Sequence, residues 1–263
     1  MAEIQFRNVT FSREDKMIFD NLSFELSDYD SYSIIGPNAF GKTSLLKLMT
    51  GELSFSGTIM INRVKVVPEN PMVLNRNIAI VFDDDFFVRE TLREEFKFSL
   101  ESLNIAPKDI TSQINYLINY FSLEELIDTP ICKLSKRNKT IAHILAFLIV
   151  NPRILVLDDL FGWLDKNFKE KLIIFLKNHG ITLVNVISDS NDSLYTDYLL
   201  VFMKNGRIAM EGPTLAVLKE EKLMHRLGMK IPFMVDLSIQ LGYYELLDTI
   251  LLNKEEMVSQ IWK

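Results

Sequence analysis

One short segment, SIIGPNAFGKTSLL at residues 33–46, constrains the fold of this chain more than any other. An apolar strand pattern ends at Gly36, four residues follow, and Gly41, Lys42 and Thr43 open a helical pattern. This order is typical of a phosphate-binding loop, in which backbone N–H groups and the positive end of a helix point at one anion. An ordinary glycine turn is the alternative. A later apolar strand that ends in aspartate argues against it.

The residue types of this loop fit a nucleotide bound together with Mg²⁺. Gly41 lets the backbone approach the phosphates, Lys42 reaches the terminal ones, and Thr43 offers a hydroxyl to Mg²⁺. Ala39 and Phe40 are unusual, since such loops generally prefer glycine and a small residue there, and Phe40 would either shield the phosphates or crowd them. The predicted nucleotide-binding residues of the loop are Gly36, Asn38, Ala39, Gly41, Lys42, Thr43 and Ser44.

A second apolar strand, RILVLDD at residues 153–159, ends in two acids. We expect Asp158 to hold Mg²⁺ directly or through water, the alternative being a strand that simply ends in a solvated aspartate. Asp159 is the candidate that polarises an attacking water, at a position where nucleotide hydrolases of this kind usually have glutamate. Its carboxylate falls back by about 1.5 Å, the length of one C–C bond. Since general-base assistance contributes roughly 10²–10⁴-fold, Asp159 either catalyses weakly or has no useful catalytic role.

The patterns along the chain alternate between strand and helix. Strand patterns dominate up to residue 82, apart from the helix that follows the phosphate loop, and alternation resumes from residue 153. Helical periodicity occupies residues 91–103, 109–121 and 123–127, and the last fifty residues read as helical with a break near KIPF. We predict an α/β nucleotide-binding domain over 1–212, with a helical subdomain at about 88–150, and a C-terminal extension over 213–263.

Composition narrows the classes of function. The 263 residues are 48% hydrophobic, enough for a real core, and the net charge of −6 argues against nucleic acid as a partner. The basic stretch at 133–139 could still contact phosphates. A single cysteine, Cys132, excludes an internal disulfide, and no stretch reaches the roughly 18 uninterrupted apolar residues of a membrane span. We expect a cytoplasmic protein that can sit against a membrane protein.

The order of these motifs resembles the nucleotide-binding subunit of ABC transporters, most of all the ATPase subunits of energy-coupling factor (ECF) importers. GPNAFGKTS is similar to the Walker A loop, ILVLDD to Walker B, and GWLD, which ends in Asp165, to the D-loop. TLREEFKFSLESLNI resembles the ECF helical insertion, and the tail from LMHRLGMKIPF resembles an extension used there for contact between ATPase subunits. The resemblance implies the ABC-type P-loop NTPase fold: a mixed sheet core, an antiparallel β subdomain, a helical subdomain and a C-terminal helical extension.

Two departures from the family pattern lie near the expected nucleotide. Where the family stacks an aromatic residue on adenine, this chain has Arg13, which either stacks on the purine or is an unpaired surface residue. At the Q-loop position glutamine is replaced by Asp83, followed by Asp84 and Asp85. Three acids would repel phosphate unless Mg²⁺ or a partner intervenes, so Asp83 is a candidate metal ligand. A solvated acidic turn is the alternative.

The family signature LSGGQ reads LSKRN here. Its residues are Leu134, Ser135, Lys136, Arg137 and Asn138. Ser135 could cap a helix as well as touch a phosphate, and the two cations that replace glycines could use their charge on a γ-phosphate in a partner's site. A purely structural basic helix start is the alternative.

The largest departure follows the strand TLVNVI. The family places there a histidine that contacts the γ-phosphate, and this chain has Ser188, followed by Asp189. His143 lies on an apolar helix and is expected in the core, and His179 precedes Gly180 in a turn that ends a helix. With both the glutamate and the histidine replaced, the resemblance implies a subunit whose catalytic positions Asp159 and Ser188 are degenerate.

From this resemblance we predict that the chain binds ATP and Mg²⁺ and hydrolyses ATP slowly or not at all. It would pair with a second, more conventional ATPase subunit as a heterodimer. An integral membrane coupling subunit and a substrate-binding membrane component would complete an importer of a small molecule such as a vitamin or a metal ion, at the cytoplasmic face of the cell membrane. The alternatives are a non-catalytic scaffold or regulatory subunit, and a soluble ABC ATPase outside transport.

Overall fold

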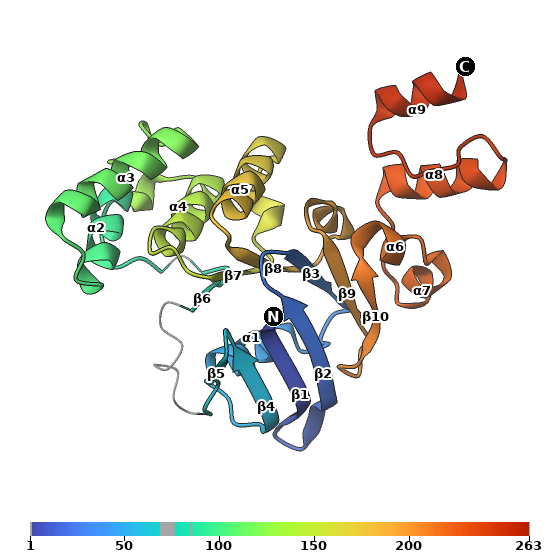
Figure 1. The fold of residues 1–263 in the computed structure, drawn as a ribbon, viewed down its shortest axis with the longest axis horizontal. Coiled ribbons are helices and arrows are strands. Elements are labelled where there is room, and N and C mark those ends of the chain that lie inside the picture. The colour runs from blue at the N-terminus through green and yellow to red at the C-terminus, as the bar shows by residue number, and fades with distance from the viewer. Residues whose placement is uncertain (1, 69–76, 85, 263) are drawn as a thin grey trace.

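The computed structural model describes residues 2–68, 77–84 and 86–262, and Figure 1 shows their arrangement. The strands are β1 (Ala2–Arg13), β2 (Lys16–Ser27), β3 (Ser31–Ile35), β4 (Ser56–Ile61), β5 (Val64–Lys65), β6 (Ile78–Val81), β7 (Ile154–Asp158), β8 (Thr182–Ile187), β9 (Tyr198–Phe202) and β10 (Ile208–Pro213). The α-helices are α1 (Lys42–Thr50), α2 (Leu92–Ser102), α3 (Pro107–Phe121), α4 (Lys136–Leu148), α5 (Lys166–Asn178), α6 (Thr214–Leu218), α7 (Glu221–Arg226), α8 (Phe233–Tyr243) and α9 (Lys254–Ile261). Short 3₁₀ helices are η2 (Ile131–Lys133), η3 (Phe161–Trp163) and η4 (Ser190–Tyr195).

Two sheets organise the described chain. One is antiparallel, in the order β2-β1-β4-β5. The other runs β10-β9-β3-β8-β7-β6, and its neighbouring pairs are parallel except for β9 with β10. The inner strands β3 and β8 are buried at every position, as expected for a sheet covered on both faces. The mixed sheet and the antiparallel β subdomain confirm the predicted fold class.

The helical segments begin and end largely where the sequence predicts. Thr91 caps α2 and exchanges hydrogen bonds with Glu94 in a capping box, so the helix begins at Leu92. Residues 123–127 correct a prediction: they form a single turn and not a helix. Leu126 and Ile127 both donate backbone hydrogen bonds to the Leu123 carbonyl, and the chain then leaves the helical path.

Three groups of buried apolar residues hold these elements together. The largest joins α2, α3, α4 and α5 to one face of β6, β7 and β8, and includes Phe96 and Phe161. The second lies between the two sheets and around α1, and includes Phe6 and Phe40. In Figure 1, α1 accordingly lies between the sheets, and α2 and α3 lie farthest from the C-terminus.

The third group joins the C-terminal region to the sheet. Met224, Met229 and Val235 pack in one cluster with Ile35 and Ile187, the last residues of β3 and β8. Helices α8 and α9 extend beyond the sheet at the upper right of Figure 1. The predicted break near KIPF falls between α7 and α8. The division into 1–212 and 213–263 remains a prediction, because β10 itself runs across it.

Among the described residues, no helix has both the length and the apolar character needed to cross a membrane.

Candidate functional site

The loop after β3 is shaped by Phe40. Its side chain is buried and stacks on Phe202, with 4.9 Å between ring centroids. A Cβ added to Gly36 would lie 2.3 Å from Cδ1 of Phe40, so glycine is required there for the ring to turn inward. Phe40 therefore neither shields nor crowds a phosphate: it anchors the loop in the core between the sheets.

Two further residues of the loop have left-handed backbone conformations. Gly41 has φ 110° and forms the N-cap of α1, and a side chain there would also clash with Phe19. Ala39 has φ 66°, a conformation that glycine adopts freely and that costs a residue with a Cβ about 1–2 kcal/mol. The glycine that such loops prefer at position 39 is thus replaced by a residue that bears this strain.

The predicted acids and the serine meet this loop because four parallel strands end at one edge. In the sheet order β3, β8, β7, β6, Gly36 follows β3, Ser188 follows β8, Asp158 is the last residue of β7, and Asp83 comes two residues after β6. Ile35 pairs with Ile187, so the phosphate loop and Ser188 leave the sheet side by side. Ligand sites in open α/β sheets form at this carboxyl edge.

Lys42, Ser188 and Asp159 form one hydrogen-bonded group. The Lys42 amine donates to Ser188 Oγ at 2.5 Å and lies 3.7 Å from Asp159 Oδ2. Ser188 binds both oxygens of Asp159, through its N–H to Oδ1 at 2.9 Å and its hydroxyl to Oδ2 at 2.5 Å. Asp159 has φ 59°, a conformation that Asp tolerates better than most residues. The phosphate-loop lysine, the acid and the serine predicted at separate motifs are therefore in direct contact.

Asp158 lies next to this group with its carboxyl half-buried. Burial raises the pKa of Asp158, Lys42 lowers it, and the negative charges of Asp159 and Asp83 raise it further. A divalent cation at this point would stabilise the charged form. The Asp158 carboxylate and the Thr43 hydroxyl are hard oxygen ligands of the kind that Mg²⁺ binds together with phosphate oxygens, so these residues fit the ion.

Asp83 has other partners than a metal. Its Oδ1 accepts from the Lys136 amine at 2.7 Å, and its Oδ2 from Trp163 Nε1 at 3.4 Å. Asp84 lies 3.5 Å from the buried His143, and Asp85 lies outside the described residues. Among the residues that the structure describes, no three His, Cys, Asp or Glu side chains gather as a metal site. Asp83 thus influences Asp158 by its charge while it holds Lys136.

The signature residues are ordered by contacts within their own chain. Ser135 caps α4 and accepts from the N–H of Asn138, and Leu134 is buried beneath the helix start. Arg137 donates to Oδ2 of Asp165, and its other amine donates to Asn138. Asp165 caps α5 by accepting from Phe168 N–H, and this bond, followed by Arg137, lowers the pKa of its carboxyl. The predicted contact of these side chains with a partner's phosphate remains a prediction.

Arg13 lies in a pocket with the phosphate loop. The pocket has a volume of about 570 Å³. It is lined by Arg13, Glu14, Lys16, Ile18, Ala39, Gly41, Lys42, Thr43 and Ser44. This volume lies in the range of small-ligand pockets, and a place for Arg13 beside a base remains a prediction.

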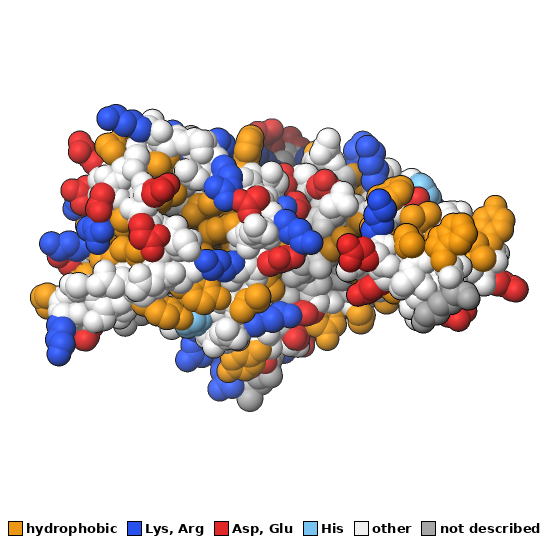
Figure 2. Space-filling model, turned by 90° about the horizontal axis from the view of Figure 1, so that it is seen from above, with side chains coloured by type: hydrophobic (Ala, Val, Ile, Leu, Met, Phe, Trp, Pro, Cys, Tyr) orange, Lys and Arg blue, Asp and Glu red, His pale blue; other side chains and the backbone are white. Residues whose placement is uncertain are grey.

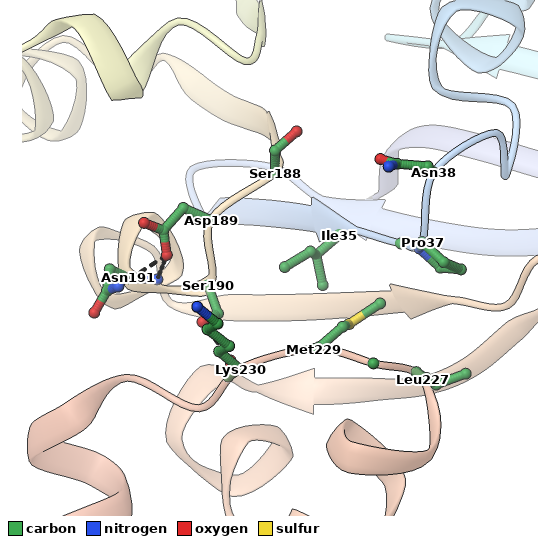
Figure 3. A pocket seen from close by; sticks show the side chains of 12 residues that line it. Ile35, Pro37, Asn38, Ser188, Asp189, Ser190, Asn191, Leu227, Met229 and Lys230 are labelled. Carbon is green, nitrogen blue, oxygen red and sulfur yellow. Dashed lines mark hydrogen bonds between the residues drawn. The ribbon is translucent and has the colours of Figure 1, made fainter.

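A second pocket, of about 540 Å³, lies on the other side of the loop. Gly36, Asn38 and Ser188 form one part of it, and residues 227–230 of the C-terminal region form the opposite wall. Figure 3 shows Ser188 and Asn38 across the opening, with Met229 and Lys230 below. Ser190 donates to the Lys230 carbonyl at 2.5 Å, which ties the segment after β8 to the C-terminal extension.

Three residues at the site were not predicted from the sequence. Trp163 stands in the D-loop, where only Asp165 had been singled out, and it also lies under the Lys136 amine, 5.5 Å from the ring centroid. Lys230 and Met229 come from the tail, whose motif suggested only subunit contact. The sequence signal for Trp163 was its place two positions before the D-loop acid.

Comparisons with known proteins agree on the family. The family model described as "ABC transporter" matches residues 19–162. The chain is 29% identical to the energy-coupling factor transporter ATP-binding protein EcfA1 of Ureaplasma parvum, over 99% of this chain and 91% of that protein. The EcfA1 of Mycoplasmoides gallisepticum is 27% identical, over 98% of this chain and 95% of its own length.

Solved structures share the fold. CbiO1 from Clostridium perfringens, part of the ABC transporter complex cbiONQ, superimposes with a TM-score of 0.76 at 22% identity, covering 90% of this chain and 98% of that one. The ATP-binding cassette MJ1267 gives 0.73 at 23% identity, covering 86% and 98%. The family match spans more than half of the chain and contains both the phosphate loop and the acids that end β7. This chain therefore belongs to the ABC transporter family.

Proposed function

We propose that this chain is the ATP-binding subunit of an ECF-type importer that takes up a small molecule such as a vitamin or a metal ion. One observation carries the nucleotide part of the proposal: the Lys42 amine lies 2.5 Å from Ser188 and 3.7 Å from Asp159, beside Asp158. A phosphate-loop lysine reaches the terminal phosphates of a nucleotide, and a neighbouring carboxylate can hold its Mg²⁺. The names of the EcfA1 relatives support the importer part.

The chain's own hydrolysis is proposed to be weak. Both oxygens of Asp159 accept hydrogen bonds from Ser188, and the aspartate is shorter than the glutamate of the family. A water placed for attack would have to compete with the Ser188 hydroxyl for the same carboxylate.

Weak hydrolysis can be measured in a complex in which the second subunit has lost its own phosphate-loop lysine. We expect residual phosphate release by this chain of about one hundredth of the intact complex or less, within the 10²–10⁴-fold contribution of a general base. Release at the rate of the intact complex would contradict weak hydrolysis while leaving ATP binding intact.

Membrane and subunit partners are supported by exposed apolar side chains. Beside the acidic turn at 83–84, Phe86 is 73% exposed, a suitable contact for an integral membrane subunit. At the other end of the molecule, hydrophobic side chains gather on the right-hand end in Figure 2. The exposed hydrophobic side chains of the C-terminal region from α8 onward include Phe233, Tyr243, Tyr244, Leu246, Leu252, Val258 and Trp262. We assign this face of the extension to contact with a second ATPase subunit.

The assembly is tested by placing charges in that face. Phe233→Asp combined with Tyr244→Asp should weaken the complex with a second ATPase subunit of the same genome by at least about tenfold, because truncated aromatic anchors cost about 2 kcal/mol or more. Met17→Asp, an exposed apolar residue in the β2 hairpin, is the matched control. Co-expression followed by light scattering measures the complex, and an unchanged mass distribution would show that this face is not the contact.

A further inference from the structure

The Ser188 hydroxyl is held as a nucleophile would be. It accepts a hydrogen bond from the Lys42 amine at 2.5 Å and donates its own proton to Asp159 Oδ2 at 2.5 Å. The Ser188 N–H fixes the other oxygen of the same carboxylate at 2.9 Å. An alcohol within hydrogen-bond reach of a base whose orientation is fixed by a further contact is the arrangement that activates serine for covalent catalysis.

The Ser188 hydroxyl also occupies the Asp159 oxygen that an attacking water would need as its proton acceptor. At the end of β7, Asp159 is the acid positioned to accept a proton from an attacking water. In this chain its Oδ2 accepts that bond from Ser188 instead. A hydroxyl covalently fixed at this point has a large advantage over a free water, because its translational freedom is already lost.

The electrophile, the terminal phosphate of a nucleoside triphosphate, would bind to the Lys42 amine that also contacts Ser188. Lysine of a phosphate loop binds the terminal phosphates of a nucleoside triphosphate. Since Lys42 Nζ lies 2.5 Å from Ser188 Oγ, a phosphate that binds this amine is brought next to the hydroxyl. This step rests on the proposed function, namely that ATP binds at the loop.

We propose that Ser188 accepts the γ-phosphoryl group of ATP bound in its own chain. The Oγ–P bond forms while the bond between the γ-phosphorus and the β,γ-bridging oxygen breaks. The proton of the hydroxyl passes to Asp159 Oδ2, and the electron pair of the broken bond stays on the β-phosphate of the leaving ADP. Phosphoserine and ADP are the products, and no oxidant or further reactant is needed.

Phosphorylation of Ser188 should prevent a second round of transfer in the same chain. Phosphoserine carries a charge of about −1.5 to −2 and would stand beside Asp158 and Asp159, with Lys42 as its cationic partner. A lysine engaged by phosphoserine is no longer available to a new triphosphate. At most one phosphoryl group per chain is therefore expected, and the modified chain should bind ATP more weakly than the unmodified chain.

The experiment incubates the full chain with saturating MgATP, digests it with trypsin and measures the mass of peptide 178–204. That peptide also contains Ser190 and Ser193, so fragmentation must locate the group, and these two serines serve as internal controls. We expect one phosphoryl group on Ser188 and none in Ser188→Ala. In Ser188→Thr we expect labelling to recover on the introduced threonine, because its hydroxyl can take the place of the serine hydroxyl. Asp159→Asn should slow the transfer by roughly 10²–10⁴-fold.

Calorimetry with MgATP separates the two ways in which the experiment can fail. ATP that binds while peptide 178–204 keeps its mass would overturn the transfer to Ser188 and leave the proposed function standing. A phosphoryl group on Ser190 or Ser193, or unchanged labelling in Ser188→Ala, would also overturn it. A chain that binds no ATP would overturn the proposed nucleotide site and this inference together.

Discussion

Lys42→Ala is expected to lower the affinity of the chain for MgATP by about 10- to 100-fold, or about 1.5–3 kcal/mol. The amine is the one cation in contact with Ser188 and Asp159 among the described residues, and it also lowers the pKa of Asp158. Removing it takes away charge-assisted hydrogen bonds to phosphate. It also leaves the carboxylates of Asp158 and Asp159 to repel the nucleotide.

Isothermal calorimetry measures this loss, and Lys47→Ala is the matched control. Lys47 lies in the last turn of the same helix, 3.9 Å from Glu52 and outside the pocket of the phosphate loop. Its removal should change the affinity for MgATP by less than about twofold, since an exposed pair of this kind contributes about 0–1 kcal/mol and is not in contact with the ligand. Equal affinities of the Lys42 variant and the intact chain would show that the loop binds no triphosphate.

Lys169→Met is expected to cost about 3–5 kcal/mol of unfolding free energy, the largest stability effect among these predictions. Lys169 on α5 donates to Asp192 in η4 at 2.7 Å, and both side chains are nearly buried. The substitution keeps most of the aliphatic length of lysine and removes the charge, so Asp192 is left buried without its cation. Because η4 follows Ser188 closely, this pair also holds the segment that contacts Asp159.

Chemical denaturation measures the cost, with Lys177→Met as the control on the same helix. Lys177 pairs with Asp197 at 3.0 Å in a more exposed position, and its loss should cost less than about 1 kcal/mol. A double replacement, Lys169→Met with Asp192→Leu, should recover most of the stability, since an apolar pair can replace a buried ion pair. Equal costs for the two single variants would contradict the role of burial.

The cost of Lys169→Met should depend on pH in a defined direction. Burial raises the pKa of Asp192 in the folded chain, and Lys169 opposes this shift. A raised folded-state pKa means that the native state takes up the proton more readily, so the related stability is present at low pH and is lost as pH rises through that pKa. Without Lys169 the pKa rises further. The variant should therefore recover stability as the pH falls, and a cost that does not change with pH would contradict this account.

The edge that carries the site could be predicted from the sequence because it follows from strand direction. Gly36 and Ser188 directly follow parallel strands and Asp158 ends another, so these residues must lie at one edge of the sheet, whatever the loops do. The inward turn of Phe40 could not be predicted in the same way. It depends on Phe202, 162 positions later, and on the missing side chain of Gly36, which together offer the ring a place that no local pattern reveals.

Ion pairs between residues far apart in the sequence were the second feature that could not be predicted from the sequence. Asp83 and Lys136 were each read against the family pattern as an isolated departure, and the structure places their charges 2.7 Å apart. An acid in place of glutamine and a lysine in place of glycine stabilise one another, so neither departure is independent of the other. Arg137 and Asp165 form a similar pair. Such compensation needs the three-dimensional distance, since 53 positions separate Asp83 from Lys136.

The small apolar cluster beneath the site has a consequence for how such subunits can diverge. Met224, Met229 and Val235 cover Ile35 and Ile187, and each of these isoleucines directly precedes a residue of the site, Gly36 or Ser188. A tail exchanged with that of a relative would have to pack apolar side chains on the same two isoleucines, or leave them facing water. Changes in the tail and changes at the phosphate loop would therefore have to be inherited together, because one group of apolar side chains supports both the tail and the two strand ends.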